Sequence, residues 1–296
     1  MRTKEAHRRT AVARVVTEVR KLPVFRSYPT LYVGSAVKGF RQRDELAGVR
    51  TFVIFIGHPR SGHSLVGSLL DAHPNIVVSH ELDVLRFVAA GYRRTQLIAL
   101  VVDHARANAV AGRKSWGYSY AVPGQWQGRF EDLQVVGDKR GRLTTVRLGE
   151  HPELLDRLAE AVGMPVAIVQ VVRDPLDNIA TMWRRADHSL DQQVDLYFTL
   201  TEACHGIEAR VAPERFHRLH LEDMVADPHT ELTALCRFID VPADPAYLDA
   251  CAAIMFDSPK QTRGDAPWTP ELLADVRRRA AATPWLDRYT AEPGPT

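Results

Sequence analysis

Residues 57–64, with the sequence GHPRSGHS, combine the residue types and spacing best suited to chemistry in this chain. They follow an apolar run and resemble a phosphate-binding loop, GxxxxGK[ST], in which backbone N–H groups surround phosphate oxygens and a lysine reaches the terminal ones. Here His63 takes the lysine position, and Arg60 places a fixed positive charge inside the loop. The pattern predicts a site for a phosphate-bearing ligand that lacks the usual Mg-triphosphate chemistry.

The elements around this loop must position it. An apolar strand at 52–56, a helix from Ser61 and a second strand at 76–79 would form a compact βαβ unit. The free N–H groups and the dipole of the helix would then point at the loop and favour an anion. Arg60 could add bidentate contacts and Ser64 a hydroxyl donor. The alternative is an ordinary tight turn between strand and helix.

A second candidate cluster follows another apolar strand, at 166–172. Arg173 comes directly after it, Pro175 opens a helix, and Thr181 lies about two turns later. Open α/β sheets bind ligands at the carboxyl ends of their strands, so Arg173 would lie at the ligand-binding edge. Asp174 and Asp177 also suit the N-terminus of a helix, where the dipole favours acids.

Composition sets broad limits. The 296 residues carry a net charge of +2, which argues against a nucleic-acid partner or an anionic membrane. Three cysteines without CxxC spacing argue against disulfides and structural zinc and favour a reducing cytoplasm. No HExxH-like cluster occurs, so no metal is expected. We expect no signal peptide, and no apolar stretch approaches the roughly 20 residues of a membrane span.

Alternating strand and helix patterns predict the fold class: an α/β, three-layer P-loop-type domain with a central parallel sheet and helices on both faces. We expect this domain over residues 49–290, after a basic and helical N-terminal extension at 1–48 and before a disordered tail at 291–296. The extension could bind a partner or polyanion, or lie on the domain as an amphipathic helix through Val15, Val16, Val19 and Leu22. The expected strands are 52–56, 76–79, 134–137, 166–172 and 216–221, and the expected helices begin near Ser61, Pro152, Pro175, Pro228 and Pro270.

Residues 59–75 and 171–183 together resemble the 3′-phosphoadenosine 5′-phosphosulfate (PAPS)-dependent sulfotransferase family, in its bacterial, carbohydrate and tyrosyl-protein branches. The resemblance extends over about 50–290. It implies PAPS as donor and adenosine 3′,5′-bisphosphate as product, with the 5′-phosphosulfate at the first segment and the 3′-phosphate at the second. Residues 257–271 would form a C-terminal cofactor loop. The implied cofactor-binding residues are Pro59, Arg60, Ser61, Gly62, His63, Ser64, Leu65, Arg173, Thr181, Ser258, Lys260 and Arg263.

The family's chemistry also requires a base for the acceptor and positive charge on the sulfonate oxygens. The resemblance implies Glu81 as the base, with His80 as a rival, and Arg60 with Lys139 as the stabilising cations. Glu81 could instead be a first-turn acid of a helix at 81–90, and Lys139 part of a surface Asp–Lys pair.

The acceptor is not named by the sequence. A hydroxyl or amine of a small molecule, carbohydrate or peptide would fit, and the oligomeric state is open, a homo-oligomer included. Residues 184–189 are a candidate lid. Two other functions compete: an atypical P-loop kinase or NTPase, and a non-catalytic nucleotide-binding module. A Rossmann dehydrogenase is disfavoured because GxGxxG is absent. The aromatic residues that could line an acceptor cleft, or belong to a local core, are Trp116, Tyr118, Tyr120 and Trp126.

Overall fold

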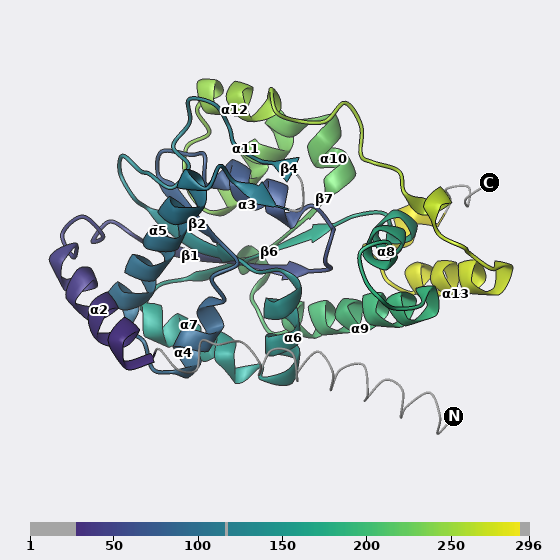
Figure 1. Ribbon diagram of the computed structural model, residues 1–296, viewed down its shortest axis with the longest axis horizontal. Coiled ribbons are helices and arrows are strands. Elements are labelled where there is room, and N and C mark those ends of the chain that lie inside the picture. The colour runs from purple at the N-terminus through teal and green to yellow at the C-terminus, as the bar shows by residue number, and fades with distance from the viewer. Residues whose placement is uncertain (1–27, 116–117, 291–296) are drawn as a thin grey trace.

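A five-stranded sheet forms the centre of the computed structural model, which describes residues 28–115 and 118–290 (Figure 1). All its strands are parallel, in the order β2-β5-β1-β6-β7. Parallel strands leave their carboxyl ends at one edge, which collects the turns that follow each strand. The strands are β1 Thr51–Gly57, β2 Ile76–His80, β5 Val135–Lys139, β6 Val166–Val172 and β7 Phe216–His220.

Strand β1 lies at the middle of the sheet and is buried along its whole length. Phe52, Ile54 and Ile56 belong to the core on one face, whereas Val53 and Phe55 belong to the core on the other. Side chains alternate between faces along a strand, and both faces are covered, so the sequence reads as a continuous apolar run.

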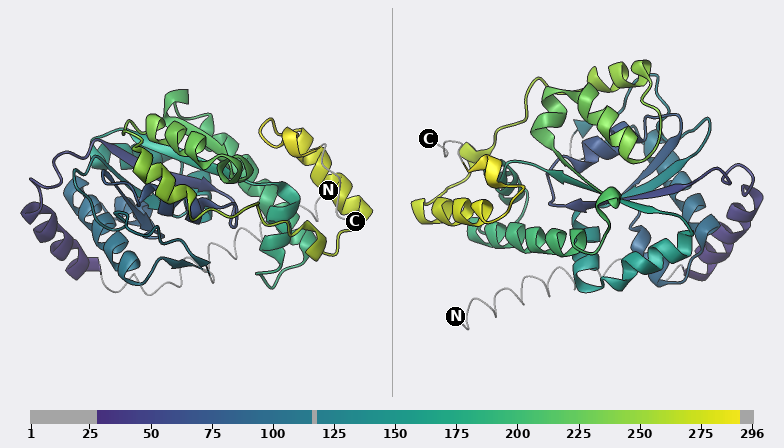
Figure 2. Two further views of the ribbon diagram at one scale, coloured as in Figure 1. Left: turned by 90° about the horizontal axis from the view of Figure 1, so that it is seen from above. Right: turned by 180° about the vertical axis from the view of Figure 1, so that it is seen from behind.

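Helices cover both faces (Figures 1 and 2). The core on the first face includes residues from α4, α5, α6, α7 and α9, and the core on the second includes residues from α3, α10, α11 and α12. Helices α8 and α13 pack with part of α9 in a third core beyond the sheet. The bounds are α3 His63–Leu70, α4 Val84–Ala89, α5 Arg94–Val110, α6 Arg142–Glu150, α7 Glu153–Val162, α8 Pro175–Trp183, α9 Leu190–Glu208, α10 Leu221–Ala226, α11 Pro228–Phe238, α12 Pro245–Ala252 and α13 Pro270–Ala281.

The expected fold class is confirmed: a parallel sheet lies between two helical layers. Several boundaries differ from expectation, and the strand expected at 134–137 spans Val135–Lys139. Helix α3 begins at His63, two residues after Ser61, because Gly62 adopts a left-handed N-cap conformation. The strand expected at 216–221 ends at His220, and the helix expected at 81–90 begins only at Val84. The sequence did not predict the two-residue antiparallel strands β3 (Lys114–Ser115) and β4 (Tyr118–Ser119).

Part of the N-terminal extension is visible as helix α2, Tyr28–Arg41, which packs against α5. Lys38 pairs with Asp103, and Gln96 Nε2 donates to the Tyr32 carbonyl at 3.0 Å. The helical face proposed at Val15–Leu22, Trp116 and the tail 291–296 lie outside the described residues. Among the described helices, none has the length and apolar character needed to cross a bilayer.

Candidate functional site

The phosphate loop joins the end of β1 to the start of α3. Its backbone turns through two residues with positive φ, Arg60 at 70° and Gly62 at 101°. A Cβ on Gly62 would lie 2.6 Å from Leu221 Cδ1, so conformation and packing both require glycine there. No side chain of the described residues caps the N-terminus of α3. Its first-turn N–H groups are therefore placed to receive an anion.

Neighbouring elements fix the shape of this loop. Asn178 Nδ2 in α8 donates to the Pro59 carbonyl at 2.7 Å, and Arg173 Nη1 donates to the Arg60 carbonyl at 3.3 Å. The Gly57 N–H donates to Thr145 Oγ1 at 2.8 Å. The loop is thus organised before any ligand arrives, which lowers the cost of binding.

His63 does not supply the missing charge of the phosphate-loop lysine. Its side chain is buried, with Nδ1 3.2 Å from Ser61 Oγ, and its ring packs against Gly141. Burial, reinforced by the charge of Lys139, lowers the His63 pKa to about 3, so the imidazole is neutral at pH 7. Burial and nearby Arg185 also lower the pKa of Arg60, which keeps its charge at any pH of interest.

Lys139, the last residue of β5, brings a cation to the loop from another strand. Its side chain is 1% exposed, and Nζ donates to Ser64 Oγ at 2.9 Å and to Glu81 Oε1 at 3.1 Å. The stem of Lys139 passes over Gly67, where an added Cβ would lie 2.9 Å from Lys139 Cγ. Lys139 is therefore a buried link between the phosphate loop and Glu81, and the surface-pair interpretation is wrong.

Glu81 lies in the turn after β2, with φ 68°, three residues before α4, so it is not a first-turn helix acid. Burial opposes its ionisation, but the charge of Lys139 prevails and lowers the Glu81 pKa to about 2. His80 Nε2 lies 3.5 Å from Lys139 Nζ, and burial together with that charge lowers the His80 pKa to about 4. At pH 7 the carboxylate is ionised and the imidazole is neutral, so each can accept a proton.

Arg173 and Thr181 lie side by side, as the sequence predicted for the second cluster. Arg173 is 6% exposed; Nη1 donates to Thr181 Oγ1 at 3.2 Å, and Nη2 donates to the Lys260 carbonyl. The same Nη1 contacts the Arg60 carbonyl, so Arg173 joins the second cluster to the phosphate loop. Thr181 Oγ1 also lies 2.8 Å from Thr262 Oγ1.

The C-terminal segment, residues 257–271, reaches this cluster, but Arg263, one of its predicted cofactor contacts, pairs with two aspartates instead. Arg263 Nη2 lies 2.8 Å from Asp177 Oδ2 and 3.1 Å from Asp174 Oδ2. Asp177 Oδ1 accepts the Arg263 N–H at 2.7 Å. Arg263 thus fastens the segment to α8, while the side chains of Ser258 and Lys260 are exposed.

The chain also matches a known protein family over most of the region that carries these residues. Residues 53–245, about two thirds of the chain, match the model of a sulfotransferase family. The chain belongs to the sulfotransferase family. The matched region includes the phosphate loop, Glu81, Lys139 and Arg173, but not the segment with Ser258, Lys260 and Arg263.

Solved structures resemble the fold of this sulfotransferase at low sequence identity. A sulfotransferase from Mycobacterium avium is 13% identical, with 90% of this chain and 83% of that chain covered and a TM-score of 0.51. The sulfotransferase domain of the Synechococcus olefin synthase is 19% identical, with 79% and 94% covered and a TM-score of 0.49. A mouse sulfotransferase complexed with PAP is 10% identical, with 81% and 89% covered and a TM-score of 0.45. A search of curated proteins returned no match.

The sequence missed one residue that positions Glu81 in this sulfotransferase. Asp138 is buried in β5 next to Lys139 and accepts from Ser79 Oγ at 2.8 Å, the Leu82 N–H at 3.0 Å and the Val84 N–H at 2.8 Å. These bonds fix the turn that carries Glu81. Burial raises the Asp138 pKa from its usual value. An acidic residue inside an apolar strand was the available signal, because buried charges need such partners.

The aromatic residues divide between the site and the local core. Tyr118 stacks on Tyr120 with ring centroids 6.2 Å apart, and Phe256 meets the Tyr118 ring edge-on at 6.1 Å. Tyr120 packs against the second core, whereas Tyr118 and Phe256 are exposed. Gln127 Nε2 donates to the carbonyls of Tyr120 and of Ser68 in α3, so this segment lies beside the helix that follows the loop. The sequence analysis did not identify Phe256 as a residue of this cluster. Trp126 lies instead beside Arg129, whose guanidinium carbon is 5.6 Å from the centroid of the Trp126 ring.

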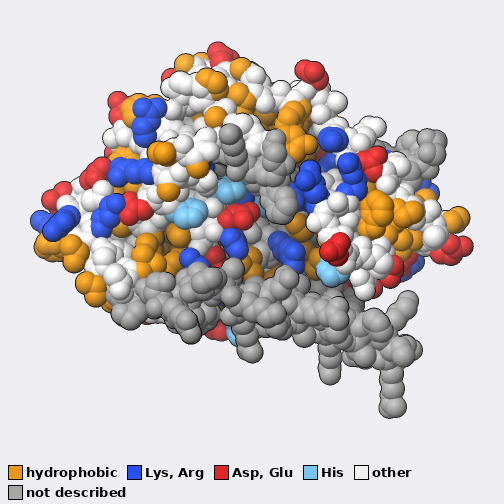
Figure 3. Space-filling model, viewed as in Figure 1, with side chains coloured by type: hydrophobic (Ala, Val, Ile, Leu, Met, Phe, Trp, Pro, Cys, Tyr) orange, Lys and Arg blue, Asp and Glu red, His pale blue; other side chains and the backbone are white. Residues whose placement is uncertain are grey.

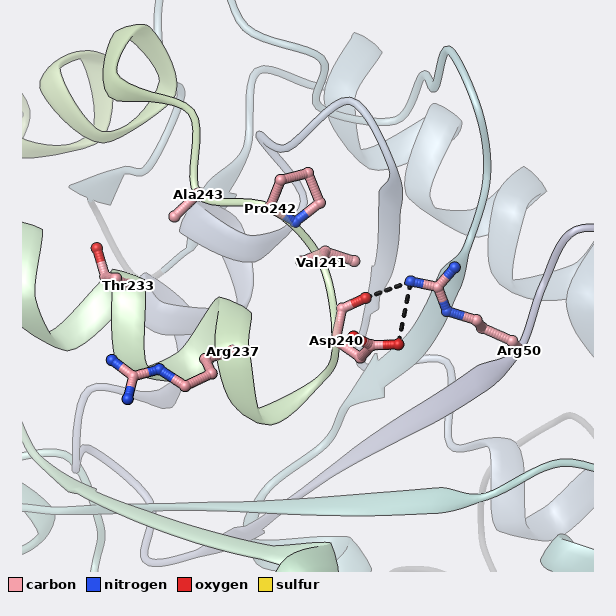
Figure 4. Close-up of a pocket in the computed structure, with 7 residues that line it drawn as sticks. All are labelled: Arg50, Thr233, Arg237, Asp240, Val241, Pro242 and Ala243. Carbon is pink, nitrogen blue, oxygen red and sulfur yellow. Dashed lines mark hydrogen bonds and ion pairs between the residues drawn. The ribbon is translucent and has the colours of Figure 1, made fainter.

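A groove elsewhere on the surface, of about 430 Å³, is not this site (Figure 4). It is formed by α11, the turn after it and Arg50, which pairs with Asp240. Arg50 precedes β1, whereas the phosphate loop follows it, so the groove lies at the opposite edge of the sheet. In Figure 3, acidic, basic and histidine side chains gather instead near the centre of the face shown.

Proposed function

We propose that this sulfotransferase moves a sulfuryl group from PAPS to a hydroxyl or amine of an acceptor. The main support for this proposal is the position of Lys139 Nζ, which donates hydrogen bonds both to Ser64 of the phosphate loop and to Glu81. One buried cation therefore connects the group that would hold the donor with the group that would activate the acceptor.

The residues present fit a donor with anionic groups at both ends. The uncapped N-terminus of α3 and residues 59–65 would hold the phosphosulfate. Arg173 and Thr181 would hold the 3′-phosphate, with exposed Ser258 and Lys260 close in sequence to the Lys260 carbonyl that Arg173 already contacts. When bound, PAPS would supply the sulfuryl group, its S–O bond to phosphate breaking as the acceptor oxygen or nitrogen forms a new bond to sulfur.

Each catalytic side chain then has a distinct task. Glu81, ionised at neutral pH, accepts the acceptor proton, and His80 is the second candidate for that role. Arg60 and Lys139 stabilise negative charge on the sulfonate and bridging oxygens. This chemistry depends on positioning and fixed charge, so we expect activity without a metal ion and in the presence of EDTA.

The acceptor class stays broad: a hydroxylated small molecule, a carbohydrate or a peptide. Exposed Tyr118 and Phe256 offer aromatic surface near the loop, which suits a ring-containing acceptor. The three thiols, Cys204, Cys236 and Cys251, are free and buried, which supports the expected cytoplasmic location.

The test compares Glu81→Ala with His80→Ala. Glu81→Ala should lower kcat by at least about 100-fold, the usual worth of a general base. Binding of adenosine 3′,5′-bisphosphate, measured by calorimetry, should be nearly unchanged because the nucleotide-binding clusters are intact. Turnover is measured as sulfuryl transfer from radiolabelled PAPS to a panel of hydroxylated and amine acceptors.

Glu160→Ala, an exposed glutamate on α7, is the matched control and should leave turnover unchanged. Wild-type turnover in Glu81→Ala together with loss in His80→Ala would assign the base to His80. Failure of well-folded wild-type protein to bind the bisphosphate would overturn the proposed donor.

A further inference from the structure

Glu222, in the first turn of α10, contacts the turn that carries Arg173. A glutamate there suits the helix dipole, but this side chain also bonds outside its own helix. Glu222 Oε1 accepts the Asp174 N–H at 2.9 Å, and that N–H belongs to the peptide that joins Arg173 to Asp174. Leu221, the residue before it, packs against the phosphate loop at Gly62. Two consecutive residues of α10 therefore contact both clusters of the proposed donor site.

Tyr289, near the C-terminal end of the described chain, holds the other oxygen of Glu222. Its hydroxyl donates to Glu222 Oε2 at 2.6 Å, and His220 Nδ1 lies 2.9 Å from the same hydroxyl oxygen. A phenol has one proton, which here goes to the carboxylate, so His220 donates from Nδ1. Burial, reinforced by the charge of Arg288, lowers the His220 pKa to about 4, so the ring is neutral at pH 7 and this is its single N–H. The hydrogen bonds thus run in one direction, from His220 through Tyr289 and Glu222 to the peptide after Arg173, and such chains strengthen their members.

The turn that carries Tyr289 is itself anchored. Arg288 forms a bidentate ion pair with Asp223 of α10, with Nη1 2.6 Å from Oδ2 and Nη2 2.8 Å from Oδ1. Tyr289 is 7% exposed and belongs to the third core together with residues of α8. This end of the described chain lies beside α8 in Figures 1 and 2. Packing and charge therefore fix the hydroxyl that holds Glu222.

We infer that Glu222, held by Tyr289, is a positioning residue for the group that binds the 3′-phosphate, an inference that rests on the proposed function because it takes Arg173 as that group. The Arg173 side chain leaves the backbone next to the peptide that Glu222 holds. A guanidinium makes bidentate contacts with a phosphate only in a narrow geometry, so fixing this peptide prepares Arg173 for the ligand. Glu222 acts through Arg173 and makes no contact with the nucleotide.

Glu222→Ala removes the acceptor of both the Asp174 N–H and the Tyr289 hydroxyl. Affinity for adenosine 3′,5′-bisphosphate, measured by calorimetry, should fall about tenfold, because Arg173 must then be ordered as the phosphate binds. Affinity for 5′-AMP, which lacks the 3′-phosphate, should change by less than about twofold because its contacts lie in the phosphate loop. KM for PAPS should rise about tenfold with kcat within about twofold of wild type, since the groups proposed for the chemistry are unchanged.

A double-mutant cycle tests whether Glu222 acts through Arg173. Arg173→Ala alone should weaken bisphosphate binding, and adding Glu222→Ala should change it by less than about twofold more. Tyr289→Phe, which removes only the hydroxyl, should weaken binding about threefold, the usual worth of one hydrogen bond. Glu222→Gln keeps an oxygen that can accept the Asp174 N–H and should recover most of the affinity lost in Glu222→Ala.

Glu214→Ala, a change at an exposed glutamate just before β7, is the matched control and should bind both nucleotides like wild type. Equal losses of bisphosphate and 5′-AMP binding in Glu222→Ala would overturn the inference by showing general damage to the site. A further tenfold loss in the Arg173→Ala background would overturn it by assigning Glu222 a direct contact with the nucleotide.

Tyr289→Phe provides the same comparison if Glu222→Ala does not fold, because it removes a single oxygen atom. Wild-type affinity for the bisphosphate in folded Tyr289→Phe would contradict the role of the hydroxyl in holding Glu222. Failure of folded wild-type protein to bind the bisphosphate would instead overturn the proposed function, so the two failures are distinct.

Discussion

Lys139 supplies the positive charge that the phosphate-loop sequence lacks. The phosphate loop has His63 where a nucleotide hydrolase has lysine, and His63 is buried and neutral. Lys139 reaches the same loop from β5 and bonds to Ser64. The cation is thus supplied by a neighbouring strand, and its position beside Glu81 couples it to the proposed base.

The pH dependence of turnover follows from this residue. Burial lowers the Lys139 pKa to about 8, with Glu81 opposing the shift. The protonated form is the useful one, so kcat/KM should be level from about pH 6 to 7.5 and fall tenfold per pH unit well above pH 8. Lys139→Arg keeps the charge and should move this decline by more than about 2 units, because arginine stays protonated.

A pH–rate profile of both proteins, with a substrate that does not titrate in this range, measures the effect. Lys38→Arg, a change at the lysine of α2, serves as control and should keep the wild-type decline. A decline near pH 8 that persists in an active Lys139→Arg enzyme would show that another group is responsible.

At the scale of elements, Asp177 connects α8 to the C-terminal segment. Its carboxylate accepts the backbone N–H groups of Thr262 and Arg263 as well as the Arg263 guanidinium. These bonds bring the Lys260 carbonyl onto Arg173. Asp177, which the sequence suggested only as an acid at a helix N-terminus, therefore holds the C-terminal segment over the second cluster.

Asp177→Ala should release this segment. The change removes the carboxylate that accepts the Thr262 and Arg263 N–H groups and that lies 2.8 Å from Arg263 Nη2, so unfolding stability should fall by about 3 kcal/mol. Bisphosphate affinity should fall about tenfold, since the segment must then be ordered on binding. Calorimetry and hydrogen exchange over 257–265 measure both effects. Asp187→Ala, at an exposed aspartate after α8, is the control, and unchanged exchange in Asp177→Ala would contradict the anchoring role.

At the scale of the whole molecule, the proposed donor would be bound by two turns that follow different strands. The loop after β1 and the turn after β6 are adjacent because β1 and β6 pair in parallel. Arg173 Nη1, in the turn after β6, donates a hydrogen bond to the Arg60 carbonyl in the loop after β1. A ligand with phosphates at both ends would therefore link the loop after β1 to the turn after β6.

Adenosine 3′,5′-bisphosphate should for this reason stabilise the fold more than either half-ligand. At about 100 times its Kd, the gain is about 2.7 kcal/mol, a rise of several degrees in melting temperature. Thermal unfolding with the bisphosphate, 5′-AMP and ATP–Mg measures the order. EDTA should not change the bisphosphate effect. A larger shift with ATP–Mg would contradict the two-cluster arrangement.

The sequence determined the features that depend on local pattern. Apolar runs located the five strands, and glycine spacing located the phosphate loop, because both follow from residues close together in the chain. The proximity of Arg173 to Thr181 also followed, since Arg173 lies just before helix α8 and Thr181 lies about two turns into it.

Tertiary structure decided everything that depends on distant residues meeting. Lys139 and Ser64 are 75 residues apart, and Asp177 and Arg263 are 86 apart, and no local pattern encodes such contacts. The buried face of α2 was likewise decided by its close approach to α5, where an added Cβ on Gly39 would lie 2.6 Å from the Thr95 carbonyl oxygen. Helical periodicity shows that a face exists, but only the packing partner determines which face is buried.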